Sequence, residues 1–260
     1  MEFSNKYIVG FALVVCLVCS LVVSLFAVGL GERQDANKRL DLQTNILAVA
    51  GLIEEGQHPS PAEVAKMFES ISADLYDRRT GERVGPAPAG YDVAALMADA
   101  KTPGKGTPTS AVDGLEDPSR VGFLPDRLLV FHVTVPGKEG WVLPIWGNGL
   151  WSTLKGFLAL EENLQRIRGI TFYEHGETPG LGGEVDNPRW KAQWRGKRIF
   201  DDAGALRIEV TKAGKAADPD FQVDGISGAT ITSRSVNNFV RLWLGEAGYG
   251  AFLRANTGRA

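Results

Sequence analysis

Residues 128–135 read LLVFHVTV, residues 136–140 read PGKEG, and residues 141–146 read WVLPIW. β-Branched and aromatic side chains dominate the two outer stretches, as is typical of strands, and Pro-Gly is a turn signal. This pattern predicts a β-hairpin that turns across residues 136–140. By the same criteria, three further strands are expected at residues 153–160, 169–174 and 206–211.

Helices are expected mainly toward the two ends of the chain. Apolar residues recur with helical spacing in residues 32–55, and Gly56 would end that helix. Ser60-Pro61-Ala62-Glu63 is a capping box with proline at the first helical position, and it predicts a helix to about Ser70. Residues 101–119 are interrupted by glycine and proline and are expected to form a loop. A last helix is expected at residues 233–244, so the sequence predicts an α+β fold with a largely antiparallel sheet.

Residues 8–30 carry no charge. As a helix they would be about 34 Å long, which matches a hydrocarbon core of about 30 Å. The alternative is a cleaved signal peptide, but an apolar signal region has only about 7–15 residues. We therefore expect a retained anchor. Cys16 and Cys19 lie inside this segment and are interpreted as small membrane-facing residues rather than a redox pair.

Net charge and cysteine content exclude several classes of function. The 260 residues carry a net charge of −3 and no basic surface that would favour nucleic acid. Outside the apolar segment there is no cysteine, so neither disulfides nor thiolate metal ligands are expected there. We expect three parts: an anchor at 1–31, a membrane-proximal helical and loop region at 32–125, and a ligand-binding domain at 126–260.

The segment Asp224-Gly225-Ile226-Ser227-Gly228-Ala229-Thr230 is the most informative one for function. Its glycines permit tight turns and the close approach of a ligand to the backbone. Ser227, Thr230 and Thr232 bring several hydroxyls together just before the last expected helix, where free N–H groups favour a phosphate. The spacing alone leaves open a simpler interpretation, a glycine turn with a hydroxyl helix cap.

Two other segments have the composition of ligand-binding loops. In residues 173–184, three late glycines let the backbone lie against a flat ligand, and Glu177 and Thr178 offer polar groups to a heterocycle edge. A metal site made from Glu174, His175, Glu177 and Glu184 is a weaker hypothesis, because no helical spacing gathers these side chains. In residues 144–152, Trp146 and Trp151 have the shape to flank an aromatic ligand, although core packing is the commoner role.

Residues 224–230 resemble the flavinylation motif of the FMN-binding domain family, Asp-Gly-x-(Ser/Thr)-Gly-Ala-(Ser/Thr). Residues 177–183 and Gly149-Leu150-Trp151-Ser152 resemble segments of the C subunit of the sodium-translocating NADH:quinone reductase, as does the N-terminal anchor. The resemblance covers most of the chain, and most densely residues 141–237. Three motifs in order are far more specific than any one of them.

The resemblance implies one covalent FMN on Thr230 in phosphoester linkage, attached by a separate magnesium-dependent flavin transferase that takes FMN from FAD and releases AMP. It implies that Asp224 and Gly225 are recognised by the transferase. The cofactor contacts that it implies are Ser227, Gly228, Ala229, Glu177, Thr178, Leu181, Leu150 and Trp151. The residues themselves predict no metal ligand and no catalytic residue: no Ser/His/Asp constellation is evident, and the three histidines, His58, His132 and His175, lie outside the motif.

The resemblance also implies an electron path from a membrane iron–sulfur centre to this FMN, then to a flavin of the B subunit and on to ubiquinone. The partners would be the A, B, D, E and F subunits, with NADH bound by another subunit. The family places the FMN domain in the periplasm of a single-pass bacterial inner-membrane protein. Positive charge at Arg33, Lys38 and Arg39, against Lys6 on the other side, favours the opposite orientation weakly.

Three alternatives remain. The G subunit of the Rnf ferredoxin:NAD electron-transport complex shares the anchor, the threonine motif and a related Glu-Thr-Pro-Gly-Leu-Gly segment. Gly182-Gly183-Glu184 and the Gly-Leu-Trp-Ser segment favour the quinone reductase. A non-catalytic FMN-binding sensor and a cofactor-free membrane anchor are the other two.

Overall fold

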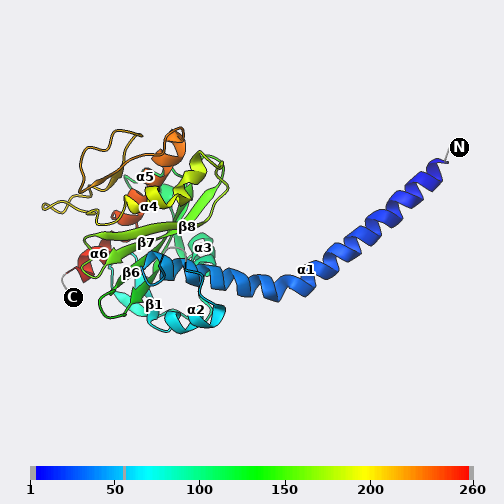
Figure 1. The fold of residues 1–260 in the computed structure, drawn as a ribbon, viewed down its shortest axis with the longest axis horizontal. Coiled ribbons are helices and arrows are strands. Elements are labelled where there is room, and N and C mark those ends of the chain that lie inside the picture. The colour runs from blue at the N-terminus through cyan, green and yellow to red at the C-terminus, as the bar shows by residue number, and fades with distance from the viewer. Residues whose placement is uncertain (1–3, 55–56, 258–260) are drawn as a thin grey trace. The chain divides into compact units, whose positions relative to one another are not determined.

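The computed structural model describes residues 4–54 and 57–257. The chain divides into two compact units, Met1–Leu42 and Gln43–Ala260 (Figure 1). The apolar part of helix α1, Asn5–Gly31, has a mean hydropathy of 2.9 and no buried residue in its apolar window. It is therefore long and apolar enough to cross a membrane.

Helix α1 spans Asn5–Val49, so the expected helix after residue 31 continues from the apolar segment without a break. It ends earlier than predicted, because Gly51 adopts a left-handed φ of 76°. The N–H of Leu52 then bonds the carbonyl of Leu47, and that of Gly51 the carbonyl of Ala48. This arrangement is a Schellman motif, which closes a helix with glycine. Gly56, the predicted stop, lies outside the described residues.

An antiparallel six-stranded sheet forms the centre of Gln43–Ala260, which confirms the predicted α+β class. In the predicted hairpin, Val133 lies opposite Gly140, so the turn falls where Pro136-Gly137 predicted it. In spatial order the strands are β2 (Arg83–Pro86), β1 (Ile71–Asp77), β5 (Arg127–Val133), β6 (Gly140–Asn148), β7 (Thr153–Glu161) and β8 (Ile167–Glu174).

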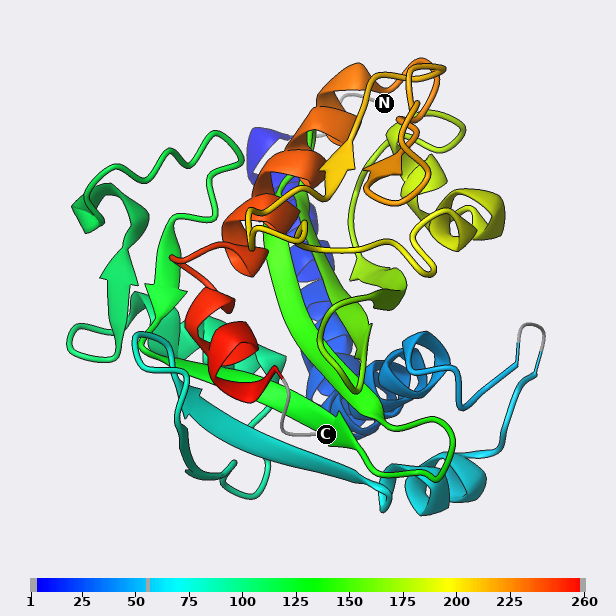
Figure 2. The same cartoon turned by 90° about the vertical axis from the view of Figure 1, so that its left-hand side faces the viewer.

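Helix α5 (Thr230–Leu244) lies across one face of this sheet (Figure 2). Phe239 packs so closely on β6 that a Cβ at Gly147 would lie 2.5 Å from its ring. The same ring meets Phe172 of β8 edge to face at 6.2 Å. Residues 45–50 contact the other face, where Thr171 donates a hydrogen bond to Asn45 at 3.4 Å. The sheet is thus buried on both sides, which explains its long apolar runs.

Several elements differ from the sequence prediction. The capping box at Ser60 is confirmed, with helix α2 at Pro61–Phe68, but Ile71 begins β1 rather than extending this helix. The expected strand at residues 206–211 is only β9 (Glu209–Val210), which pairs in parallel with β10 (Gln222–Val223). The expected loop at residues 101–119 contains two short elements. These are strand β3 (Gly106–Pro108), which pairs with β4 (Phe123–Pro125), and the 3-10 turn η1 (Thr109–Ala111).

Helices outside the predicted set complete the domain: α3 (Val93–Lys101), the 3-10 turn η2 (Gly182–Asp186), α4 (Pro188–Ala192) and α6 (Gly250–Asn256). The expected boundary at residue 125 stays a prediction. Strands β1 and β2 precede that residue, and β1 pairs along its whole length with β5, which follows it.

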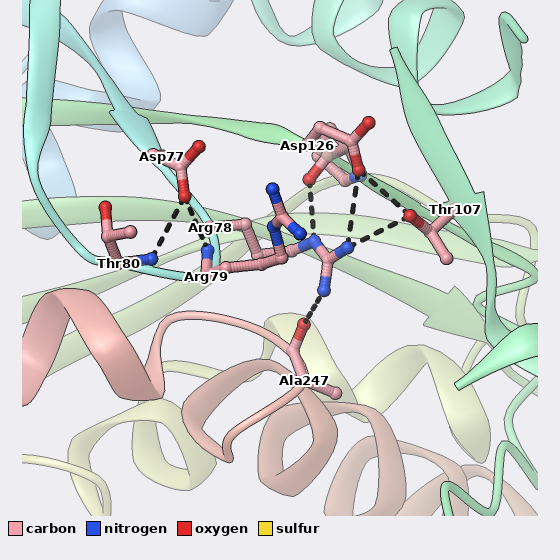
Figure 3. A network of polar contacts seen from close by, with 8 residues as sticks. Asp77, Arg78, Arg79, Thr80, Thr107, Asp126 and Ala247 are labelled. Atoms are coloured by element: carbon pink, nitrogen blue, oxygen red, sulfur yellow. Dashed lines mark hydrogen bonds and ion pairs between the residues drawn. The ribbon is translucent and has the colours of Figure 1, made fainter. Parts of the chain in front are cut away.

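A buried arginine fixes one end of the sheet (Figure 3). Arg78, which follows β1, donates hydrogen bonds to the carbonyls of Pro125 at 3.0 Å and Ala247 at 3.2 Å. It also reaches Thr107 at 3.1 Å and the Asp126 carboxylate at 3.3 Å. One guanidinium therefore ties the end of β1 to β3, to the β4–β5 turn and to the segment between α5 and α6.

Candidate functional site

Thr230 is the first residue of helix α5 and is exposed, so the helix begins three residues before the predicted position. Ala229 precedes it with φ −124° and ψ 49°, and its methyl side chain provides no cap. Ser233, the predicted start, lies within the first turn, where its hydroxyl accepts the N–H of Ile226 at 2.9 Å. The side chain of Thr230 thus projects from the amino end of a helix whose first turn holds no acidic residue.

The motif loop contacts the loop that contains residues 177–183. Gly228 has a left-handed φ of 76°, and a Cβ at this position would lie 3.0 Å from Leu181 Cδ2. Ser227 and Gly228 are exposed, whereas Ala229 is buried. Glycine at residue 228 therefore allows both the backbone conformation and the close approach of the two loops.

Glu177 is the centre of the site, with only 5% of its surface exposed. Its carboxylate accepts the Thr232 hydroxyl at 2.6 Å and the N–H of Trp151 at 2.9 Å. It also accepts the N–H groups of Leu150 and Ser152, both at 3.3 Å. One side chain thus joins the β6–β7 turn to the first turn of α5.

The carboxylate of Glu177 stays charged in this environment. Burial raises the pKa of the group, but the hydrogen bonds from Thr232, Trp151, Leu150 and Ser152 outweigh burial. The pKa is therefore lowered from its ordinary 4.5. At neutral pH the group acts only as an acceptor, which suits the four donors around it.

Two glycines make room for this carboxylate. A Cβ at Gly149 would lie 2.6 Å from Glu177 Oε1, and a Cβ at Gly182 would lie 2.6 Å from Oε2 and 2.7 Å from Thr232 Oγ1. Both distances are shorter than van der Waals contact. The glycines of the two predicted loops therefore serve the packing around Glu177.

The segment after Glu177 is a tight turn. The carbonyl of Thr178 accepts the N–H groups of Leu181 at 3.1 Å and Gly183 at 2.9 Å, and Gly180 has a φ of 75°. Proline at residue 179 followed by a left-handed glycine is the signature of a type II turn. The turn leaves the Leu181 side chain 45% exposed beside the motif loop.

Large apolar side chains stand exposed on the segments around Thr230. Trp151 is 71% exposed, and Leu150, Leu181 and Ile231 are also exposed. The segments that carry these side chains are joined through Glu177 and Gly228, so they are candidates for contact with a ligand or a partner. Ile231 was not identified from the sequence, although its position next to Thr230 is the signal for it.

The structure brings most of the predicted site residues together and gives several of them definite partners. Thr232 was noticed only as one hydroxyl of the motif, and its partner Glu177 precedes it by 55 residues. Asp224 and Gly225 contact a different part of the chain, Thr211 and the loop of residues 212–217 that follows it.

The side chains of the metal hypothesis have other partners. His175 pairs with Asp186 at 2.6 Å, and Glu184 accepts the side-chain amide of Asn187 at 2.6 Å. Glu174 pairs with Lys155 at 2.6 Å. Within residues 4–54 and 57–257, no group of three or more His, Cys, Asp or Glu side chains is arranged to hold a metal ion.

Comparison with known proteins places this site inside a recognised domain. Residues 149–245 match the FMN-binding domain family, and this range includes every predicted cofactor contact. Among relatives, the C subunit of the Na(+)-translocating NADH-quinone reductase of Pseudomonas aeruginosa is 44% identical over 93% of this chain and 92% of its own. The corresponding protein of Yersinia pestis is 42% identical over 93% and 89%.

Solved structures agree with the fold. The crystal structure of Shewanella oneidensis NqrC has a TM-score of 0.73 and 32% identity, covering 85% of this chain and 98% of that one. The C subunit of the Na(+)-translocating NADH-quinone reductase from Parabacteroides distasonis has a TM-score of 0.65 and 27% identity, covering 86% and 96%.

Proposed function

Because the chain belongs to the C-subunit family of the Na(+)-translocating NADH-quinone reductase, we propose that it carries one FMN in phosphoester linkage to Thr230 and relays electrons within that complex. The observation that carries the proposal is the position of Thr230, an exposed residue at the start of α5. Gly228 of the same motif approaches the exposed Leu181, and Glu177 joins the first turn of α5 to the turn that carries the exposed Trp151.

The residues present fit an FMN. The free N–H groups and positive dipole end of α5 favour a phosphate at its first residue. Glycine at residue 228 lets the motif loop pass close to Leu181, because a Cβ there would lie 3.0 Å from Leu181 Cδ2. Leu150, Trp151, Leu181 and Ile231 offer apolar surface to a planar ring. When bound, FMN supplies reversible electron transfer, and the protein supplies its position and electrostatic surroundings.

In the proposed site, Glu177 positions the segments that would contact the flavin. Its carboxylate fixes the backbone that carries Leu150 and Trp151, and it fixes Thr232 two residues beyond Thr230. The side chains proposed to contact the ring and the phosphate are therefore connected through one buried group. Thr178, Ser227 and Ala229 complete the proposed contacts.

Attachment needs help from outside the chain, because a threonine hydroxyl is a poor nucleophile at its ordinary pKa. We propose that a magnesium-dependent flavin transferase activates Thr230. The Thr230 oxygen then forms a bond to the FMN phosphorus of FAD, the pyrophosphate bond breaks, AMP leaves and the hydroxyl proton is released. Asp224 and Gly225 are needed for recognition by the transferase.

The remaining assignments follow the family. The chain is a single-pass protein of the bacterial inner membrane anchored by Asn5–Gly31, with the FMN domain in the periplasm. It works with the A, B, D, E and F subunits. It accepts electrons from a membrane iron–sulfur centre and passes them toward the flavin of the B subunit and ubiquinone, while NADH binds elsewhere in the complex.

The decisive experiment is co-expression of the full-length protein with a flavin transferase and export to the periplasm. We expect a fluorescent band that survives denaturation and a mass gain of FMN minus water, and both should be absent in Thr230→Ala. A fluorescent band of equal intensity in Thr230→Ala would refute attachment at this residue. Turnover of a complex carrying Thr230→Ala tests the relay, which predicts loss of quinone reduction.

A further inference from the structure

We infer that Asp224 acts in flavin attachment as a positioning residue, by holding the loop of residues 212–217 in the shape that the flavin transferase binds. This inference rests on the proposed attachment at Thr230. It assigns the interaction surface to the loop and not to the Asp224 carboxylate.

The Asp224 carboxylate is already occupied by the loop. Oδ2 accepts the N–H of Gly214 at 2.9 Å, and Oδ1 accepts those of Lys215 at 3.0 Å and Ala216 at 3.3 Å. A carboxylate offers about four lone-pair directions, so three of them are used within the protein. Successive N–H groups around one anion form a nest, which fixes the backbone that contributes them.

The backbone of Asp224 is fixed from the opposite direction. Its N–H donates to Gln193 Oε1 at 2.9 Å, and its carbonyl accepts the indole N–H of Trp190 at 2.9 Å. Asp224 therefore connects a firmly held chain segment to an exposed loop. Asp224 therefore holds the loop in one conformation. Its carboxylate is engaged by three loop N–H groups, so it offers little free charge to a partner.

Gly225 places the same loop against the attachment motif. A Cβ at Gly225 would lie 2.4 Å from the carbonyl oxygen of Thr211 and 3.0 Å from the N–H nitrogen of Ala213. Any side chain at residue 225 would push the loop away. The first two residues of the motif thus perform one task, because one binds the loop by hydrogen bonds and the other lets it approach.

The loop itself depends on these contacts. Residues 212–217 are all exposed. Apart from the bonds to Asp224, the N–H of Lys215 also donates to the Lys212 carbonyl, which accepts the Thr211 hydroxyl as well, and the N–H of Ala217 donates to Gln222 Oε1. Without the carboxylate, the three N–H groups would turn to water at little cost to the domain. Loss of Asp224 should then disorder an exposed surface and leave the fold intact.

The test compares initial rates of FMN transfer to the full-length protein in detergent, with purified transferase, FAD and Mg²⁺. Three variants are compared. Asp224→Ala removes the carboxylate. Lys215→Pro keeps Asp224 but removes the backbone N–H of residue 215, and Lys215→Ala keeps that N–H and removes only the lysine side chain. Asp201→Ala is the control, since the Asp201 carboxylate binds the N–H groups of Ala203 and Ala205 in another exposed loop, with an additional ion pair to Arg207 at 3.6 Å.

We expect Asp224→Ala and Lys215→Pro to raise the KM for the acceptor protein by about tenfold or more, with kcat at saturating acceptor changed less than about twofold. Lys215→Ala and Asp201→Ala should transfer as wild type does. Hydrogen exchange of residues 212–217 should accelerate in the first two variants alone, with melting temperatures near that of the wild type.

Two results would overturn the inference. Normal transfer to Lys215→Pro with an accelerated loop exchange would show that loop order is irrelevant, and an equal defect in Lys215→Ala would assign recognition to the lysine side chain. A second donor variant, Ala216→Pro, replaces Lys215→Pro if that protein fails to fold. Absence of transfer to the wild type, or equal transfer to Thr230→Ala, would instead refute the proposed function.

Discussion

The hydroxyl of Thr232 donates a hydrogen bond of 2.6 Å to the carboxylate of Glu177. Thr232 lies two residues beyond Thr230 in the first turn of α5, and Glu177 also binds the backbone of residues 150–152. The buried Glu177 carboxylate therefore fixes the position of the turn that carries Trp151 relative to the start of α5, where the proposed attachment residue lies. Changes at this contact should affect stability and the flavin environment together.

Replacement of Thr232 by valine should destabilise the flavin-free protein by about 1.5–3 kcal/mol, because a hydrogen bond to a charged acceptor is lost at nearly constant volume. For a domain of this size the melting temperature should fall by about 2–4 °C per kcal/mol. Thr230→Val, at an exposed position, is the control and should stay within about 0.5 kcal/mol of wild type. Equal melting of Thr232→Val and wild type would refute the role of this bond.

Replacement of Gly182 by alanine should displace the Glu177 carboxylate, since the new Cβ would lie 2.6 Å from Oε2. Forcing a group into such a packed position typically costs about 1–3 kcal/mol. Gly176→Ala is a control in the same segment, because its Cβ would make an ordinary contact of 3.4 Å with Ser152. Chemical denaturation measures both variants, and a Gly182→Ala protein as stable as Gly176→Ala would contradict this packing.

Protonation of Glu177 should weaken the site in acid. The folded pKa is lowered from 4.5, so the folded protein releases this proton more readily than the unfolded chain does. The contribution of the carboxylate is complete above 4.5 and is lost as the pH falls through the lower folded pKa. Melting curves should show Glu177→Gln less stable than wild type at neutral pH, with a difference that shrinks below 4.5. A difference that is constant with pH would exclude this charge effect.

Trp151→Ala should leave the melting temperature nearly unchanged, because the side chain is 71% exposed. In flavin-loaded protein, however, removal of an indole near the ring should raise flavin fluorescence and alter its visible circular dichroism. Trp141→Ala, a partly buried tryptophan of the β5–β6 hairpin, should lower stability without this spectral change. Unchanged flavin spectra in Trp151→Ala would place the ring elsewhere.

Strongly patterned elements were predictable from the sequence. The hairpin around Pro136-Gly137, the capping box at Ser60 and the long apolar helix are local features, and each appears in the structure. Strand β1 was missed: the helix that begins at Pro61 was expected to end at about Ser70, and no element was predicted for the residues that form β1 directly after it. Its assignment as a strand depends on pairing with β5, which lies far along the chain.

In the candidate site, too, local features were predictable and contacts between distant segments were not. Glycine and hydroxyl spacing identified the loops, because tight turns and helix starts have local signatures. The partners of Glu177 and Asp224 were not predictable, since both carboxylates bind backbone N–H groups that carry no residue-specific signal. Such contacts are decided by where the chain returns in three dimensions.

The contacts of helix α6 set a limit on when this domain can finish folding. Gly81, just after β1, packs so tightly on Ala251 and Phe252 that a Cβ there would lie 2.3 Å from the Ala251 carbonyl oxygen, and Arg78 binds Ala247. The end of β1 is thus completed by contacts with residues far along the chain, and Arg78 and its partner Ala247 are 169 residues apart. During synthesis, the end of β1 is made long before these partners and stays uncovered until they follow, because contacts between distant segments close slowly. Nascent chains halted before residue 247 should therefore lack this cover and bind a chaperone.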